Sequence, residues 1–309
     1  MGFGFAIPRL RRAGIVGKDM HKPDRPEVPE LGGLLLVAGF SAGMLMAIAF
    51  DTFLTRFISI SLAEVFSVLS VVLIAALIGV VDDLIPLRQI TKAILPIFIA
   101  VPLIAVRAGD TTIAFPFIGS IDLGIIYSLV LIPIGVTGAA NAVNMLAGFN
   151  GEVSGVGFVA VGSLAIIAYH VHDTAAFLIL VAALGALLAT IYFNWYPSKI
   201  FIGDVGTLSI GAIIASAVII GNFELAGVII IIPYALDFLI KAKNRFPTSS
   251  YEGSWGVYRD GKLFCPESGP MGLGLLILKL TGGTKERNVT LILMGLEAVC
   301  GGLAIWLFW

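Results

Sequence analysis

Val80-Val-Asp-Asp-Leu-Ile-Pro-Leu-Arg-Gln-Ile-Thr-Lys92 ends one long apolar run of the sequence and leads into the next. About twenty mostly apolar residues precede it, which is the length that a helix needs to cross a bilayer. Pro86 would break such a helix, so Asp82 and Asp83 are predicted where the helix leaves the membrane. Adjacent carboxylates repel each other and are costly to desolvate, and a divalent or other nearby cation would relieve both penalties. A solvated loop with two acids is the simpler interpretation, and the other segments must decide between the two.

The composition indicates a membrane protein. The chain has 309 residues, of which 58% are hydrophobic and 13% charged, with a mean hydropathy of +1.02. A soluble domain would carry about 25% charged residues. We therefore expect an all-α polytopic membrane protein, with residues 1–309 as a single integral membrane domain. Cys265 and Cys300 are far apart in the sequence and indicate neither a disulfide framework nor a cysteine metal site. No feature indicates nucleic acid as a partner.

Nine apolar runs predict nine transmembrane helices. The run 93–107 is short and contains Pro96 and Pro102, so we expect it to be kinked or tilted. Residues 1–30 are polar and basic and are expected to form an ordered loop beside the membrane. Residues 1–8 also look like the end of an apolar span, which would make ten helices if a first helix is missing from this start. The nine runs are 31–50, 61–81, 93–107, 121–140, 153–171, 174–193, 207–221, 225–241 and 289–308.

Charge asymmetry orients these spans. Of the 19 Lys and Arg residues, all but Arg56 and Arg107 fall on one side, counting Lys241 where it leaves its span. By the positive-inside rule that side is cytoplasmic. The last cytoplasmic loop, 242–288, is expected to bind substrate. Within it, Asp260-Gly261 between short alternating segments predicts a small β-hairpin with a type I′ turn. The short apolar run 271–280 is expected to be a buried or interfacial helix that does not cross.

Three further polar clusters fall on the same predicted side, and each has an ordinary explanation when taken alone. Asn141, Asn144 and Asn150 could form a helix cap and turn, although Asn141 and Asn144 would share a helix face. Asp204 could be an N-cap. The basic segment 241–247 could be a membrane anchor. Together with Asp82 and Asp83, however, these residues offer hard oxygen ligands for Mg²⁺ and cations for phosphate oxygens. The combination predicts an anionic substrate bound with Mg²⁺.

These segments resemble the polyprenyl-phosphate N-acetylhexosamine-1-phosphate transferases, and most closely their archaeal and eukaryotic branch. That branch transfers GlcNAc-1-phosphate from UDP-GlcNAc to dolichyl phosphate and releases UMP, a first membrane step of glycan assembly such as N-glycosylation. The resemblance covers nearly the whole chain in order. It rests on residues 17–22 (GKDMHK), 28–30 (VPE), Asp82-Asp83 with Lys92, 141–151 (NAVNMLAGFNG), 201–204 (FIGD), 244–247 (NRFP) and 286–290 (ERNVT).

The resemblance implies a role for each matching residue. Asn144 and Asp204 would hold Mg²⁺, with Mn²⁺ as an alternative, while Asp82 and Asp83 would lie beside the lipid phosphate. Asn244 stands where eukaryotic members carry a histidine. The other implied roles are stacking on uracil by Phe201, a hydrogen bond to uracil from Asn150, phosphate binding by Lys92, Lys243 and Arg245, a sugar pocket shaped by Arg245, Asn244 and Glu30, and substrate contacts on the same face from Lys22 and Asn141.

The partners implied are UDP-GlcNAc, a polyprenyl or dolichyl phosphate and the membrane itself, and a homodimer is left open. The membrane would be the plasma membrane of an archaeon or the endoplasmic reticulum of a eukaryote, with the active site on the cytoplasmic face. One alternative is an undecaprenyl-phosphate sugar-1-phosphate transferase for cell-surface polysaccharide. Another is a lipid-phosphate transporter, in which ionisable residues would lie near the bilayer midplane. Asp237, the deepest such candidate, is instead expected to form a helix-end ion pair with Lys241.

Overall fold

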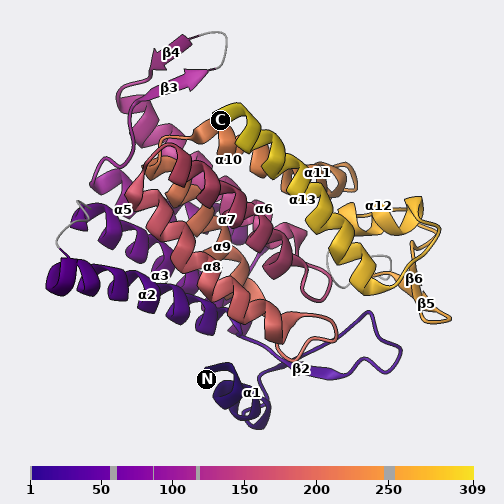
Figure 1. Ribbon diagram of the computed structural model, residues 1–309. Coiled ribbons are helices and arrows are strands. Elements are labelled where there is room, and N and C mark those ends of the chain that lie inside the picture. Colours follow the sequence, from indigo (N-terminus) through magenta and orange to yellow (C-terminus); the bar gives the residue numbers. More distant parts are fainter. Residues whose placement is uncertain (1, 56–60, 86, 116–118, 247–254) are drawn as a thin grey trace.

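The computed structural model describes residues 2–55, 61–85, 87–115, 119–246 and 255–309 and is mostly helical (Figure 1). Three two-stranded antiparallel hairpins accompany the helices. In chain order the elements are α1 (Gly2–Arg12), β1 (Val16–Lys18), β2 (Glu27–Pro29), α2 (Gly33–Phe50), the π-helix η1 (Asp51–Thr55), α3 (Leu62–Leu84), α4 (Gln89–Ile94), the 3-10 helix η2 (Leu95–Ala100), α5 (Val101–Ala105), β3 (Thr112–Phe115), β4 (Gly119–Asp122), the π-helix η3 (Tyr127–Leu131), α6 (Ile132–Leu146), α7 (Glu152–His170), α8 (Thr174–Asn194), α9 (Gly203–Ile220), α10 (Glu224–Ile230), α11 (Ile232–Lys243), β5 (Val257–Arg259), β6 (Lys262–Phe264), α12 (Leu273–Leu280) and α13 (Glu286–Phe308).

Long apolar helices confirm an integral membrane protein, although they do not confirm the expected count of nine spans. Within the described ranges, seven helices are long and apolar enough to cross a bilayer, and the bent pair α10–α11, with a 53° break, could make an eighth. The expected span 93–107 corresponds to a shorter apolar helix, Ile90–Ala105. Its middle is a 3-10 helix that begins next to Pro96, which agrees with the kink expected from its prolines.

Helix α9 is the centre of the bundle and is buried along nearly its whole length. It packs closely between α3 and α6. A Cβ atom on Gly79 of α3 would lie 2.4 Å from the Val205 backbone, and one on Gly211 would lie 2.4 Å from the carbonyl oxygen of Ala139 on α6. Glycine is therefore required at both crossings. The position of α9 fixes the ends of α3 and α6 beside its own first turn.

Different hairpins mark the two ends of the bundle. The hairpin β3–β4 projects at one end, and α1, β2 and β5–β6 gather toward the other (Figure 1). The expected hairpin in the last loop is present, and its turn residues Asp260 and Gly261 have φ values of 47° and 77°, as a type I′ turn requires. Helix α12 is the expected short helix. The Asp237–Lys241 ion pair also forms, at 2.8 Å.

The N-terminal region corrects one expectation. Residues 1–30 were expected to form a loop, but the described part contains helix α1 and the hairpin β1–β2. Basic residues Arg9, Arg11 and Arg12 lie in the last turn of α1, where they interact favourably with the helix dipole. Phe3 is buried against Phe193 of α8, with ring centroids 4.9 Å apart. The apolar half of α1 is thus anchored to the bundle, which explains why this segment is helical.

Candidate active site

Asp83 joins the end of α3 to the start of α9. Its Oδ1 accepts a hydrogen bond from the backbone N–H of Asp204 at 2.8 Å, and its Oδ2 accepts one from Val205 at 3.3 Å. A Cβ on Gly203 would lie 2.3 Å from Oδ2, and Gly203 has a φ of +64°, so this turn needs glycine. The interpretation of Asp204 as an N-cap is therefore wrong, because Asp83 satisfies the first N–H groups of α9. Asp204 keeps its own carboxylate free of that task.

Asp82, Lys92 and Asp204 form the polar cluster at this junction, together with Asp83. The Lys92 ammonium lies 2.7 Å from Asp82 Oδ2 and 3.6 Å from Asp204 Oδ2. Asp82 Oδ1 accepts a hydrogen bond from the backbone N–H of Leu87 at 3.0 Å. The Asp204 side chain is about a quarter exposed and also interacts with Asp82. We call Asp82, Asp83, Lys92 and Asp204 the aspartate cluster.

Glu30 adds a fourth carboxylate beside the aspartate cluster. Burial, and secondly the nearby charge of Asp83, raise the pKa of Glu30 above its usual range. Four carboxylates thus converge, and among the described residues Lys92 is the one cation that forms ion pairs with them. This surplus of negative charge and hard oxygen donors would be stabilised by a divalent cation.

Asn141 and Asn144 come to the aspartate cluster from the end of α6. The Asn141 amide donates a hydrogen bond to the carbonyl oxygen of Ala93, next to Lys92, at 3.2 Å. Asn144 follows about one turn later on the same helix face, as expected. No side-chain hydrogen bond of Asn144 is present among the described residues, so its amide oxygen remains available to a ligand.

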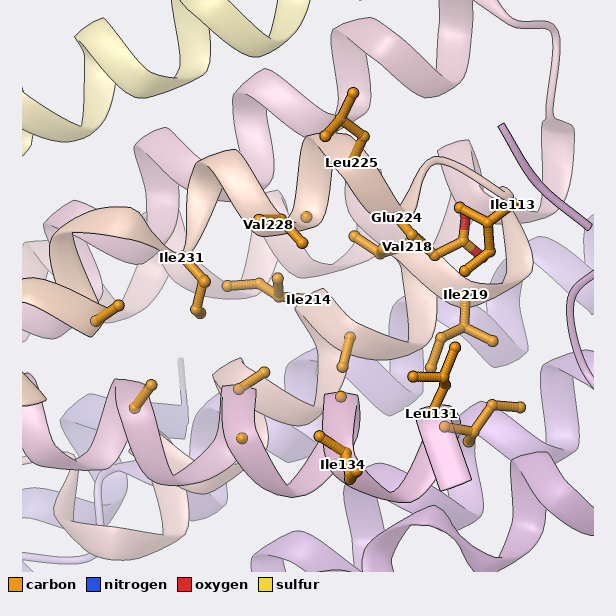
Figure 2. Close-up of a pocket in the computed structure, with 18 of the residues that line it drawn as sticks. Ile113, Leu131, Ile134, Ile214, Val218, Ile219, Glu224, Leu225, Val228 and Ile231 are labelled. Carbon is orange, nitrogen blue, oxygen red and sulfur yellow. The ribbon is translucent and has the colours of Figure 1, made fainter. Parts of the chain in front are cut away.

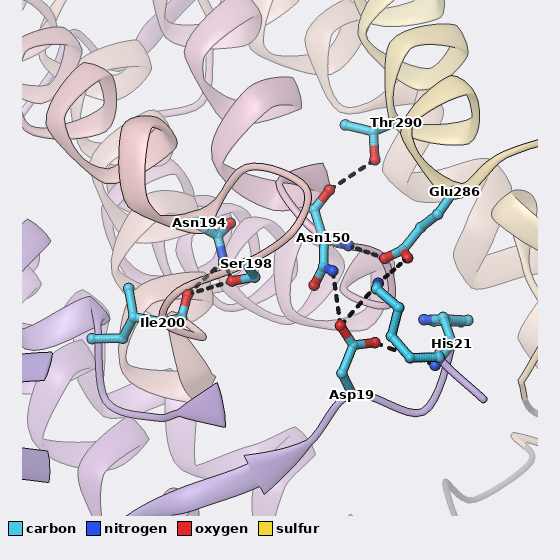
Figure 3. Close-up of polar contacts among 9 residues, drawn as sticks. Asp19, His21, Asn150, Asn194, Ser198, Ile200, Glu286 and Thr290 are labelled. Atoms are coloured by element: carbon cyan, nitrogen blue, oxygen red, sulfur yellow. Dashed lines mark hydrogen bonds and ion pairs between the residues drawn. The ribbon is translucent and has the colours of Figure 1, made fainter. Parts of the chain in front are cut away.

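A second set of charged and polar side chains, which we call the buried clasp, consists of Asp19, Lys22, Asn150 and Glu286 (Figure 3). The Lys22 ammonium lies 3.0 Å from Asp19 Oδ2 and 2.5 Å from Glu286 Oε2. Asn150 donates its amide to Asp19 Oδ2 at 2.9 Å and its backbone N–H to Glu286 Oε1 at 2.9 Å. Its carbonyl oxygen accepts from the Thr290 hydroxyl at 3.1 Å. The clasp therefore ties the N-terminal segment to the loop after α6 and to the start of α13.

Burial alone would lower the pKa of Lys22, but Glu286 and Asp19 raise it above its usual range, so Lys22 stays charged. His21, beside the clasp, stacks on Phe149 with ring centroids 4.5 Å apart and meets Trp255 edge-on at 5.4 Å. Burial lowers the pKa of His21 to about 4, so its ring is neutral near pH 7. Sequence reasoning named neither Asp19, His21 nor Glu286 as a site residue, although all three lie within the quoted segments 17–22 and 286–290.

Phe201 and Asn244, for which the resemblance implies contacts with uracil and with the sugar, lie on two separate segments. Phe201 is held beside the N-terminal segment, because its N–H donates to Pro29 and its carbonyl accepts from Gly32, both at 2.8 Å. Asn244 donates its amide to the carbonyl oxygens of Ile240 and Pro270 at 2.8 and 3.1 Å.

Lys243 and Arg245, on either side of Asn244 at the end of α11, are exposed. In the described ranges they form no ion pair with the aspartate cluster. Ion pairs and hydrogen bonds therefore link Asp82, Asp83, Lys92 and Asp204. Glu30 lies within the electrostatic influence of Asp83, Asn141 is bonded next to Lys92, and the segment 243–245 stays outside this set.

An apolar groove lies along α6 (Figure 2). Its volume is about 830 Å³, and its walls come from η3 and α6, from α9 and from the bent pair α10–α11. Asn141 lines it near the end of α6, which we call the inner end, and Tyr127 and Glu224 line it at the starts of η3 and α10, which we call the outer end. Gly135 and Gly138 also line it, and an added Cβ at either would meet no atom within 4 Å. The groove is thus open space suited to a long hydrocarbon chain.

Comparisons with known proteins agree on one family. The profile of glycosyl transferase family 4 matches residues 65–222. A protein of Saccharolobus solfataricus is 38% identical over 97% of this chain and 90% of its own length, and one of Sulfolobus acidocaldarius is 35% identical over the same shares. Both carry the provisional name UDP-N-acetylglucosamine–dolichyl-phosphate N-acetylglucosaminephosphotransferase. A Dictyostelium discoideum protein with that name is 27% identical over 94% of this chain and 80% of its own length.

Proposed function

The chain belongs to glycosyl transferase family 4, and we propose that it transfers GlcNAc-1-phosphate from UDP-GlcNAc to a polyprenyl or dolichyl phosphate at the cytoplasmic membrane face. One observation carries this proposal. Asn141 lines the inner end of the apolar groove and is also hydrogen-bonded next to Lys92 of the aspartate cluster. A lipid phosphate whose tail occupied the groove would therefore present its head group to Lys92. The relatives' names favour this acceptor over the undecaprenyl and transporter alternatives.

Mg²⁺ is the cofactor that the donor groups fit. Mg²⁺ prefers oxygen ligands and takes one or two carboxylates together with substrate phosphates. Asp204 and Asn144 would hold it, since Asp83 is already committed to the N–H groups of α9. Mn²⁺ accepts the same oxygen ligands. When bound, the metal would offset the negative charge of the donor pyrophosphate.

The reaction is then a phosphoryl transfer between two bound anions. An oxygen of the lipid phosphate attacks the β-phosphorus of UDP-GlcNAc, and the bond from that phosphorus to the UMP oxygen breaks. Such a transfer depends on positioning and on charge stabilisation. The acceptor phosphate needs little help from a base, because its second pKa is about 6. Lys92 would orient it and stabilise the developing charge.

The contacts of the two aspartates support direct attack over a covalent aspartyl intermediate. Both oxygens of Asp83 accept backbone hydrogen bonds, and Asp82 is paired with Lys92 and with the Leu87 N–H. These partners withdraw electron density from both carboxylates and make each a weaker nucleophile. Direct attack predicts that the enzyme releases no UMP from UDP-GlcNAc until an acceptor is added. A burst of UMP without acceptor would establish the covalent route.

The test of the proposed function is a transfer assay in membranes that contain the protein. Radiolabelled UDP-GlcNAc, a polyprenyl phosphate and Mg²⁺ should give a labelled lipid, and EDTA should abolish it. A panel of other UDP-sugars defines the donor. If no EDTA-sensitive labelled lipid forms with UDP-GlcNAc, the proposed donor or the proposed metal is wrong. Formation from a different UDP-sugar would keep the transferase and replace the donor.

A further inference from the structure

The outer end of the groove carries a polar pair that the proposed reaction does not use. The Tyr127 hydroxyl donates a hydrogen bond to Glu224 Oε1 at 2.5 Å. Both residues line the groove, whose neighbouring wall residues there are Ile113, Val218 and Ile219 (Figure 2). Covering the Glu224 carboxylate with hydrocarbon would remove it from water and therefore cost free energy.

Neighbouring backbone segments fix the positions of Tyr127 and Glu224. Tyr127 is 1% exposed and begins the π-helix η3, an irregularity that is frequent at functional sites. A Cβ on Gly109 would lie 2.6 Å from the Tyr127 hydroxyl oxygen, so the Gly109 backbone packs closely against that hydroxyl. The next residue, Asp110, donates its backbone N–H to the Asn222 side chain, two residues before Glu224. The pair is a fixed end wall of the groove.

The spacing of the two polar ends sets a length. Tyr127 and Asn141 lie at the outer and inner ends of one continuous helical segment, η3–α6. Their separation along it is about 20 Å, the length of roughly four extended isoprene units. Between them the groove wall is apolar. Beyond Tyr127 and Glu224 the tail would have to leave the protein and continue among lipid chains.

We propose that the Tyr127–Glu224 pair is the outer limit of acceptor recognition, so that the enzyme distinguishes acceptors only over the isoprene units nearest the phosphate. This inference rests on the proposed function, because it assumes that the groove holds the acceptor tail. Units inside the limit contact α6, α9 and α10, and later units lie in the bilayer. The tail moves from one apolar medium to another, so each unit contributes through packing rather than through the hydrophobic effect.

The experiment measures KM for farnesyl, geranylgeranyl and undecaprenyl phosphate in nanodiscs of one lipid composition. For the unmodified protein, KM should fall from farnesyl to geranylgeranyl phosphate and then stay level. In the double variant Tyr127→Phe with Glu224→Leu, undecaprenyl phosphate should become the better acceptor, with a KM roughly threefold below that of geranylgeranyl phosphate. A level profile in the double variant would overturn the proposal.

A second variant tests the same limit if the double variant does not fold. Val228 lies one turn after Glu224 on the groove wall and is 60% exposed, so Val228→Trp should shorten the apolar length. Geranylgeranyl phosphate should then lose its advantage over farnesyl phosphate. An unchanged profile in Val228→Trp contradicts the proposal.

Gly138→Leu separates this proposal from the groove assignment itself. The leucine would fill open groove space without a clash and should raise KM for all three acceptors. Gly185→Leu is the matched control, because Gly185 lies in α8, away from the groove, and its Cβ would also meet no atom within 4 Å. If Gly138→Leu behaves like Gly185→Leu, the groove does not hold the tail. If it raises KM for all three while the unmodified protein keeps improving with undecaprenyl phosphate, only the length limit is wrong.

Discussion

The aspartate cluster and the buried clasp contain the same kinds of charged groups but differ in how completely those groups are paired. In the clasp, Lys22 lies between two carboxylates, and Asn150 donates its side-chain amide to Asp19 and its backbone N–H to Glu286. In the aspartate cluster, Lys92 pairs with Asp82 and Asp204, and Asp83 and Glu30 add two further carboxylates beside them. Each carboxylate of the clasp thus has the Lys22 ammonium and an Asn150 N–H as partners, and these contacts stabilise the fold. The aspartate cluster has a surplus that a cation and substrate phosphates can complete.

The largest expected effect is on the clasp. Lys22→Met would leave the Asp19 and Glu286 carboxylates buried without a cation, which should cost about 3–5 kcal/mol of folding stability. Thermal unfolding in detergent measures this. Lys18→Met is the matched control, because Lys18 is exposed in the same hairpin. Equal melting temperatures for the two variants would contradict a structural role for the clasp.

Removal of a charge from the aspartate cluster should act on activity and spare the fold. Asp204→Asn is expected to lower kcat by about 100- to 1000-fold, while relief of carboxylate repulsion keeps the melting temperature the same or higher. The transfer assay and thermal unfolding on one preparation provide both numbers, with exposed Asp24→Asn as the control. If activity falls together with the melting temperature, Asp204 has a structural role like that of the clasp residues.

Acid should lower the folding stability of the protein through protonation of His21, which lies beside the clasp. Its pKa is about 4 in the folded protein against 6.5 for the free group. The unfolded chain therefore binds the proton first, and stability should fall as pH drops from 6.5 toward 4, by at most about 3 kcal/mol. Melting temperatures across that range test this, and His21→Phe should flatten the dependence. If the slope is the same in both proteins, another group is responsible.

Substitution of Asp83 should have the smallest effect, and it should change both folding stability and kcat. Asp83→Asn keeps one oxygen acceptor for the first turn of α9 and loses the other, with an expected cost of about 1–2 kcal/mol. It also removes one charge from the aspartate cluster, so kcat should change less than in Asp204→Asn. Urea or thermal unfolding and the transfer assay measure the two parts. An effect on kcat as large as that of Asp204→Asn would place Asp83 directly on the substrates or the metal.

Local patterns predicted the features that depend on neighbours in the sequence. Apolar runs located the long helices, Asp260-Gly261 located the hairpin turn, and the spacing of Asp237 and Lys241 predicted their ion pair. The distribution of Lys and Arg predicted that the segments containing Pro29, Asp83 and residues 201–204 lie on the same side of the membrane. Hydrogen bonds join these segments, between Asp83 and Asp204 and between Pro29 and Phe201. These predictions succeed because period, turn chemistry and charge act over a few residues.

Features that join distant segments could not be predicted in this way. Lys22 and Glu286 are 264 positions apart, and nothing local to Lys22 indicates its second partner. Asp83 as the cap of α9 depends on how α3 and α9 cross at Gly79. The groove exists because α10–α11 bends beside α6 and α9. The roles that the resemblance implies for Phe201, Asn150, Lys243 and Arg245 remain predictions.

The most direct test of the account follows the β-phosphorus of the donor. UDP-GlcNAc labelled at that atom is incubated with the membrane protein, Mg²⁺ and a polyprenyl phosphate, and the lipid and nucleotide fractions are separated. Transfer of GlcNAc-1-phosphate predicts that the label enters the lipid together with the sugar and that unlabelled UMP is released. Label recovered in UDP, with the sugar alone on the lipid, would contradict it.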